Sequence, residues 1–108
     1  MKKIEALIPP GKLEEIKAAL MKEGIRGMTL CELGDYDRHR RHVAFYRGLE
    51  YVVDILPRIK IEVIVEDEEL RAVTDAIIGA LRSGHLEDGQ LTILPVEAVI
   101  RLRTGAHA

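Results

Sequence analysis

Two arginines near the end of the chain, Arg101 and Arg103, are well suited to binding an anion. They are two residues apart, so on a strand both guanidinium groups would point to the same side. Each guanidinium can form two parallel hydrogen bonds to a phosphate. The pair is therefore a candidate phosphate clamp, although two solvent-exposed arginines on a surface strand would show the same spacing.

A segment bracketed by glycines provides a second candidate anion site. Gly84 and Gly89 enclose a turn that begins at Ser83. Glycine permits backbone conformations in which several N–H groups point at one anion. The same glycines would also serve a simple turn, so the segment by itself predicts a turn and is only compatible with a phosphate site.

Metal binding and covalent catalysis find little support in the sequence. Asp37, His39 and His42 could contribute to a metal site, but their spacing matches no closed metal motif. Cys31 lies among apolar neighbours in a predicted strand, which is typical of a small buried side chain. No nucleophile, base and orienting group stand at a recognisable spacing. We therefore expect neither a bound metal nor an enzyme.

Composition limits the partners. A chain of 108 residues with 47% hydrophobic residues can build one core, which predicts a single domain over residues 1–108. The net charge of -2 provides no global attraction for nucleic acid or an anionic membrane, and Arg38, Arg40 and Arg41 lack interleaved aromatic residues. No apolar run approaches the ~20 residues that span a bilayer. Cys31 has no partner for an internal disulfide and no secretory signal is visible, so we expect a cytoplasmic protein.

Hydrophobic periodicity predicts the elements that must position these residues. The predicted strands are residues 3–8, 28–33, 58–65, 90–94 and 99–103. Apolar residues three or four apart predict helices from Lys12 to Gly24 and from Asp67 to Leu81, and the second helix has an acid-rich start. The polar stretch 35–54 is predicted to be a loop, and the tail after Gly105 to be disordered.

The order of these elements predicts an α+β fold. It is the ferredoxin-like split βαβ sandwich, an antiparallel sheet with two helices on one face and a long loop between strands 2 and 3. That loop exceeds the ~12–15 residues above which loops in compact domains are usually functional or disordered. Many unrelated functions use this fold, so it does not indicate an activity.

Several segments resemble the PII nitrogen-regulatory signal proteins at matching spacing along nearly the whole chain. They are residues 1–6, 27–29, 46–48, 50–54, 56–57, 88–89 and 99–105. The resemblance implies a homotrimer with an adenine-nucleotide site in each cleft between subunits. It also implies a regulatory loop, about residues 36–55, that contacts a regulated target such as an ammonium transporter or a metabolic enzyme.

The resemblance also assigns site residues. The residues implied at the adenine and ribose are Leu7, Thr29, Glu62 and Ile64. The residues implied at the phosphates are Arg38, Glu87, Asp88, Gly89, Gln90, Arg101 and Arg103, and they include the nucleotide-binding turn at about 83–90. ATP, ADP and AMP are the expected ligands, with Mg²⁺ left open. Tyr51 stands where some members are uridylylated and is a candidate modification site.

The chain departs from the family at residues that concern ligands. Members have Gly-Phe-Gly-Arg-Gln where this chain reads Asp35-Tyr36-Asp37-Arg38-His39. The added side chains restrict positive φ, and imidazole suits Mg²⁺ poorly, which argues against classical 2-oxoglutarate sensing. Gln90 replaces a lysine that meets the distal phosphates, which predicts a weaker preference for ATP over ADP or AMP. The alternative is a sensor that couples adenine nucleotide to another anion, such as bicarbonate, in carbon metabolism.

Overall fold

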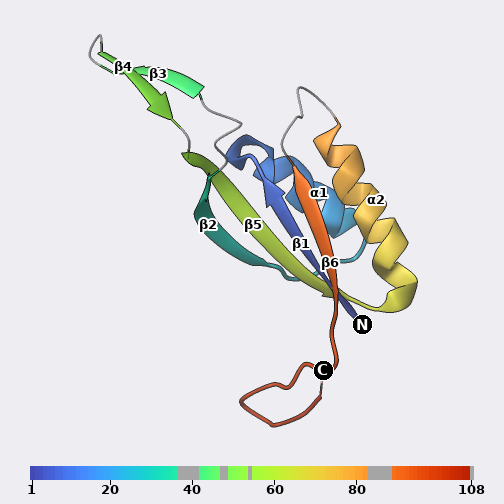
Figure 1. Ribbon diagram of the computed structural model, residues 1–108. Helices are drawn as coiled ribbons and strands as arrows, with labels where there is room; N and C mark the ends of the chain where they lie inside the picture. The colour runs from blue at the N-terminus through green and yellow to red at the C-terminus, as the bar shows by residue number, and fades with distance from the viewer. Residues whose placement is uncertain (37–41, 47–48, 54, 83–88, 108) are drawn as a thin grey trace.

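The computed structural model describes residues 1–36, 42–46, 49–53, 55–82 and 89–107. Its main sheet contains four antiparallel strands in the order β2-β5-β1-β6. These are β1 (Lys2–Ile8), β2 (Thr29–Tyr36), β5 (Ile55–Val65) and β6 (Gln90–Pro95). Helices α1 (Leu13–Lys22) and α2 (Leu70–Leu81) cover one face of it (Figure 1). Because β5 separates the two strands that α1 connects, the predicted split βαβ arrangement is confirmed.

Each helix begins with a short 3₁₀ turn. The turn η1 (Pro10–Lys12) has proline at its first position, where the fixed φ of proline suits a helix start. The turn η2 (Asp67–Glu69) is the predicted acid-rich start, and the reciprocal bonds of a capping box join Glu66 and Glu69. The two helices are therefore found within a few residues of their predicted bounds.

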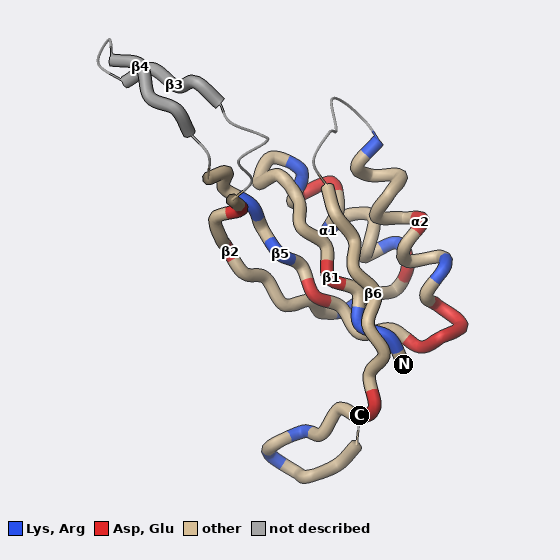
Figure 2. The backbone as a smooth tube through the Cα atoms, in the orientation of Figure 1, with Lys and Arg blue, Asp and Glu red and all other residues tan. Residues whose placement is uncertain are grey.

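Basic and acidic residues are interspersed along the described backbone, so neither sign of charge is confined to one part of it (Figure 2). The described residues form two α-helices, α1 with ten residues and α2 with twelve. Neither helix is long and apolar enough to cross a membrane.

The core between the sheet and the helices is entirely aliphatic. It consists of Ile4, Ala6, Ile8, Ile16, Leu20, Ile59, Ile61, Val63, Val65, Val73 and Ile77. The strand members alternate along β1 and β5 because successive side chains point to opposite faces. The alternation of apolar residues in 58–65 predicted this strand from the sequence, and the structure confirms it.

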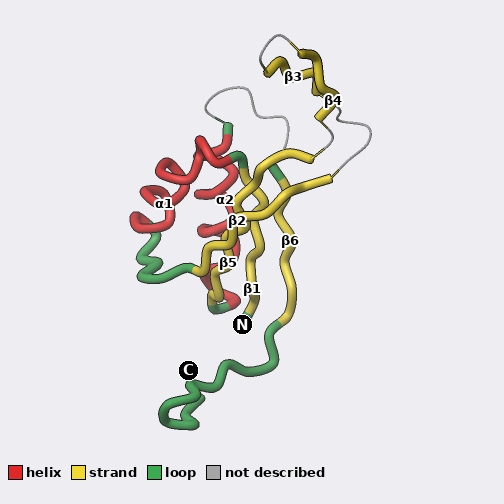
Figure 3. Tube along the Cα trace, turned by 90° about the vertical axis from the view of Figure 1, so that its left-hand side faces the viewer, coloured by secondary structure: helices red, strands yellow, loops and turns green. Residues whose placement is uncertain are grey.

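The opposite side of the sheet, which we call the open face, is covered by neither helix (Figure 3). It presents the side chains of β1 and β5 that point away from the core. They include Lys3 on β1 and Lys60, Glu62 and Ile64 on β5. Ile64 is 45% exposed. The open face therefore combines charged side chains with apolar ones that a single chain leaves in solvent.

The stretch predicted to be a plain loop contains two strands. β3 (His42–Tyr46) and β4 (Leu49–Val53) pair antiparallel in a separate two-stranded sheet. In addition, β2 continues to Tyr36 and β5 begins at Ile55, three residues before the predicted start. Pro57 obscured this extension because proline weakens a strand prediction. At Pro57, however, β5 pairs with β2 alone, since its pairing with β1 begins at Ile59.

The C-terminal arm, residues 96–107, also differs from prediction. Residues 99–103 form no strand within the described chain, and Ile100 makes only an isolated bridge to His107. The arm closes in a turn in which Gly105 has a φ of 72° and its N–H donates to the carbonyl of Arg101 at 2.7 Å. The backbone N–H of Arg101 donates to the carbonyl oxygen of Ala106 at 2.9 Å, so the described part of the tail after Gly105, Ala106 and His107, is held in a turn and does not show the predicted disorder.

Candidate functional site

A hollow of about 500 Å³ lies where the C-terminal arm passes the open face. Its lining residues are Gly27, Met28, Thr29, Glu62, Val63, Ile64, Val99 and Arg101. Four of them, which we call the arm-side group, were singled out from the sequence: Thr29, Glu62, Ile64 and Arg101. Residues from three distant parts of the chain thus meet at one place.

The strand register explains how the arm-side group forms. Thr29 is the first residue of β2 and lies directly opposite Glu62 of β5. Directly opposed residues in an antiparallel pair point to the same face, and so do residues two apart on one strand. Thr29, Glu62 and Ile64 therefore share the open face, and the arm adds Arg101 beside them.

Glu62 is the acidic group of this hollow, and neighbouring lysines hold it in its ionised form. Lys60 Nζ lies 3.3 Å from Glu62 Oε1, and Lys3 Nζ lies 3.4 Å from Oε2. The hydrogen bond from Lys60, together with the charge of Lys3, lowers the pKa of Glu62 below its ordinary value. Lys3 also pairs with Glu5 at 3.1 Å, and the hydrogen bond to Glu5 and the charge of Glu62 raise the pKa of Lys3.

The hollow thus has an acidic wall and a basic wall. Glu62 offers carboxylate oxygens that accept hydrogen bonds, as from amino or hydroxyl groups. Arg101 offers a guanidinium that suits a phosphate or a carboxylate. An elongated ligand with polar donors at one end and an anionic group at the other fits this polarity.

The predicted pairing of Arg101 with Arg103 is not found. Both arginines are exposed, but Arg101 lines the hollow and Arg103 is not among the described lining residues. The prediction assumed a strand over residues 99–103, and without that strand the two side chains need not point the same way.

A second group of predicted residues, which we call the turn-side group, lies at the opposite end of the main sheet, where β1 ends and β6 begins. It consists of Leu7, Gly89 and Gln90, and Leu7 pairs with Gln90 across β1 and β6. A Cβ on Gly89 would lie 3.2 Å from Leu81 Cδ1 and 3.8 Å from the Leu7 carbonyl oxygen, so glycine allows a close approach there.

The two groups are separated along the sheet. Ile64 pairs with Lys3 of β1, which is four residues before Leu7. At a rise of ~3.3 Å per residue, Ile64 lies about 13 Å from the level of Leu7 along the strands, and Glu62, which pairs with Glu5, lies about 7 Å from that level. The structure therefore assembles each group within one chain but does not join them in one hollow of the described residues.

Comparison with known proteins bears on the identity of the chain. Residues 1–106 match the family model described as "Nitrogen regulatory protein P-II". Over 105 residues the chain is 49% identical to the nitrogen regulatory protein P-II of Rhizobium meliloti (strain 1021) and to that of Azospirillum brasilense. It is 48% identical to that of Microchaete diplosiphon, and each alignment covers 97% of this chain and 94% of the relative.

The chain belongs to the P-II family of nitrogen regulatory proteins. This confirms the resemblance inferred from the sequence segments. The relatives are named as regulatory proteins, so the chain is a signal-transduction regulator of the P-II type.

Several predicted residues of this P-II protein lie outside the described residues. They are Arg38, Glu87 and Asp88, together with Asp37 and His39 of the considered metal site. Tyr51 falls within β4, of which only the backbone is described. Their roles stay predictions. Within the described ranges, no group of three or more His, Cys, Asp or Glu could hold a metal ion.

One prediction about Cys31 was wrong for the single chain. Its thiol is exposed and lies 3.7 Å from the carbonyl oxygen of Glu32. Cys31 lies opposite Lys60, on the open face of the edge strand β2, so neither helix covers it. Apolar neighbours in the sequence predicted burial, but only the sheet order shows which strand is at the edge.

An ion pair at the base of the segment 37–54 was also missed. Arg58 is 7% exposed and is the buried charged residue of the described chain, and its Nε lies 3.8 Å from Asp35 Oδ2. It lines a hollow of about 470 Å³ with Pro10, Glu32, Leu33, Pro57 and Ile59. The opposite charges could have suggested the pair, but β2 was not predicted to extend as far as Asp35.

Proposed function

We propose that this P-II protein binds adenine nucleotides in clefts between the subunits of a homotrimer. We further propose that residues 36–55 transmit nucleotide occupancy to a partner protein of nitrogen metabolism, such as an ammonium transporter. The observation on which the proposal rests is the hollow in which Thr29, Glu62, Ile64 and Arg101 meet. It agrees with the residues implied independently by the family resemblance.

The chemistry of the arm-side group suits a nucleotide. Ile64 supplies an apolar surface for the purine, and Glu62 accepts hydrogen bonds from amino or hydroxyl groups. The guanidinium of Arg101 binds a phosphate through charge-assisted hydrogen bonds. The guanidinium of Arg101 orients the nucleotide with its phosphates toward the arm, and Glu62, held ionised by the lysines, faces the donor groups.

A second copy of the chain would complete this site. The arm-side and turn-side groups lie about 7 to 13 Å apart along one sheet, and in the proposed trimer Gly89 and Gln90 of a neighbour approach the Arg101 of this chain. The arm exposes Ile100 by 53% and Leu102 by 100%, and the open face exposes Ile64 by 45%. Large apolar side chains that a single chain leaves in solvent are typical of a subunit interface.

The proposal is tested by calorimetric titration with ADP, alongside light scattering for the mass of the assembly. Arg101→Ala should weaken ADP binding by about 10-fold or more, because a charge-assisted phosphate contact is lost. Arg71→Ala is the matched control, since Arg71 is a 95% exposed arginine on α2 paired with Asp75. A monomeric mass, the absence of binding at millimolar adenylate, or equal affinity of the two variants would contradict the proposal.

A second candidate function couples the nucleotide to a small anion such as bicarbonate. The observation that favours it is the buried guanidinium of Arg58 beside a hollow of about 470 Å³. The carboxylate of Asp35, 3.8 Å from Arg58 Nε, would repel a dicarboxylate such as 2-oxoglutarate more strongly than a monoanion. Titration of the ADP- and ATP-loaded protein with bicarbonate and with 2-oxoglutarate distinguishes the two functions. Preferential binding of 2-oxoglutarate would exclude the second.

A further inference from the structure

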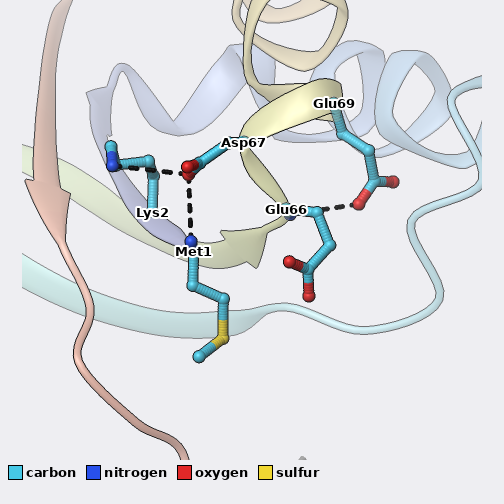
Figure 4. Close-up of polar contacts among 5 residues, drawn as sticks. All are labelled: Met1, Lys2, Glu66, Asp67 and Glu69. Carbon is cyan, nitrogen blue, oxygen red and sulfur yellow. Dashed lines mark hydrogen bonds and ion pairs between the residues drawn. The ribbon is translucent and has the colours of Figure 1, made fainter.

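Asp67 joins the start of α2 to the first two residues of the chain (Figure 4). The α-ammonium of Met1 donates to Asp67 Oδ1 at 2.9 Å, and Lys2 Nζ lies 3.3 Å from the same oxygen. The hydrogen bond from the ammonium and that from Lys2 lower the pKa of Asp67, so it is ionised at neutral pH. One carboxylate thus holds two cations.

Met1 in turn holds the beginning of the C-terminal arm. Its carbonyl oxygen accepts a hydrogen bond from the backbone N–H of Val96 at 3.1 Å, just after β6 ends at Pro95. The ladder between β1 and β5 starts at Lys2 and does not include Met1. A residue beyond the end of a strand stays ordered only when other contacts hold it, and Asp67 supplies such a contact.

The arm then leads directly to the candidate nucleotide site. Val99 and Arg101, three and five residues after Val96, both line the hollow with Glu62. Among the described residues, the other hydrogen bonds of the arm join arm residues to one another, as between Arg101 and Ala106. The bond from Val96 to Met1 therefore extends the pairing of β1 with β6 beyond Lys2 and Pro95, and among the described residues it is the last backbone attachment of the arm to the sheet.

We propose that Asp67 is a positioning residue for the C-terminal arm: by holding residues 1 and 2 it fixes the Met1 carbonyl that anchors Val96, and so places Arg101 in the hollow. The effect on ligand affinity rests on the proposed nucleotide site, whereas the anchoring of the arm does not. If Asp67 only stabilised the start of the helix through its charge, its substitution would leave the hydrogen bond between Val96 and Met1 unchanged.

Hydrogen exchange of the full chain tests the anchoring without any ligand. Asp67→Asn should accelerate exchange at the Val96 amide by about 2- to 5-fold, the range expected for loss of exposed ion pairs. Glu68→Gln is the matched control, because it removes a charge from the same turn but from a residue with no ion pair to any described residue. Equal exchange at Val96 in the two variants would overturn the proposal.

A double-mutant cycle tests the route through Arg101. Asp67→Asn should weaken ADP binding by about 2- to 5-fold in the natural chain and by much less in the Arg101→Ala background. Glu68→Gln should leave affinity unchanged. Additive effects of the two substitutions would overturn the route to Arg101. If the natural chain binds no adenylate, the proposed function fails, and the exchange at Val96 still decides whether Asp67 anchors the arm.

Discussion

The two faces of the main sheet differ in what one chain does with them. On the helix-covered face, Ile4, Ile61 and Ile77 are 0% exposed and the packing is aliphatic. On the open face, Lys3 and Glu62 keep side-chain exposures of 31% and 26% and are joined by ion pairs. The first face is complete within the chain and supplies stability. The second presents the groups of the proposed nucleotide site and subunit interface, where the fold does not need a core.

The strongest challenge to this comparison is a substitution in the covered core. Leu20→Ala removes a 0% exposed side chain of α1 and should lower the free energy of unfolding by about 2–5 kcal/mol. Met21→Ala, at the adjacent and 69% exposed position, should change it by less than about 1 kcal/mol. Denaturant titration of both variants measures the difference, and similar losses would show that burial in the single chain does not locate the stabilising face.

A substitution in the turn-side group should change binding without changing the fold. Gln90→Lys restores the cation that family members have, and it should raise the affinity for ATP by about 10-fold through a charge-assisted phosphate contact. Gln90→Met, of similar length but uncharged, is the control. Calorimetry with ATP and ADP provides the comparison, and an unchanged ATP affinity would place Gln90 away from the distal phosphates.

The smallest expected effect concerns the charges of the open face. The folded-state pKa of Glu62 is lowered, so its contribution to stability is present above its ordinary pKa of 4.5 and is lost as the pH falls through the folded value. The pKa of Lys3 is raised, so its contribution is present below 10.5 and is lost at higher pH. Glu62→Gln should therefore be less stable than the natural chain at pH 7 and equally stable in strong acid. Thermal unfolding at a series of pH values tests this, and a difference that persists in acid would contradict it.

Local patterns predicted the elements that pack by themselves. The alternation from Ile59 to Val65 identified the central strand, because every second side chain had to enter the core. Helical spacing likewise identified the buried residues Ile16, Leu20, Val73 and Ile77. These predictions succeeded because burial within one element follows from the period of its own backbone.

The misses have other causes. The extension of β2 to Tyr36, which pairs with Ile55, and the attachment of Val96 to Met1 depend on residues far apart in the sequence, whereas β3 and β4 pair as a local hairpin. The two strands of the hairpin are rich in strand-forming residues, with the sequences HVAFY and LEYVV, and they were missed because the whole stretch 35–54 was interpreted as one polar loop. The separation of Arg103 from Arg101 at the hollow follows from the local turn that the arm forms in place of the predicted strand.

By itself, the sequence determined the helices, the core strands, the fold class and the family, since each is encoded in periodicity or in runs of matching residues. Only the tertiary structure decided that Thr29, Glu62, Ile64 and Arg101 share one hollow, that Arg58 lies buried beside Asp35, and that Asp67 reaches Met1. The physical reason is that strand register and the direction of the arm are set by long-range backbone pairing, which has no local signature in the order of the residues.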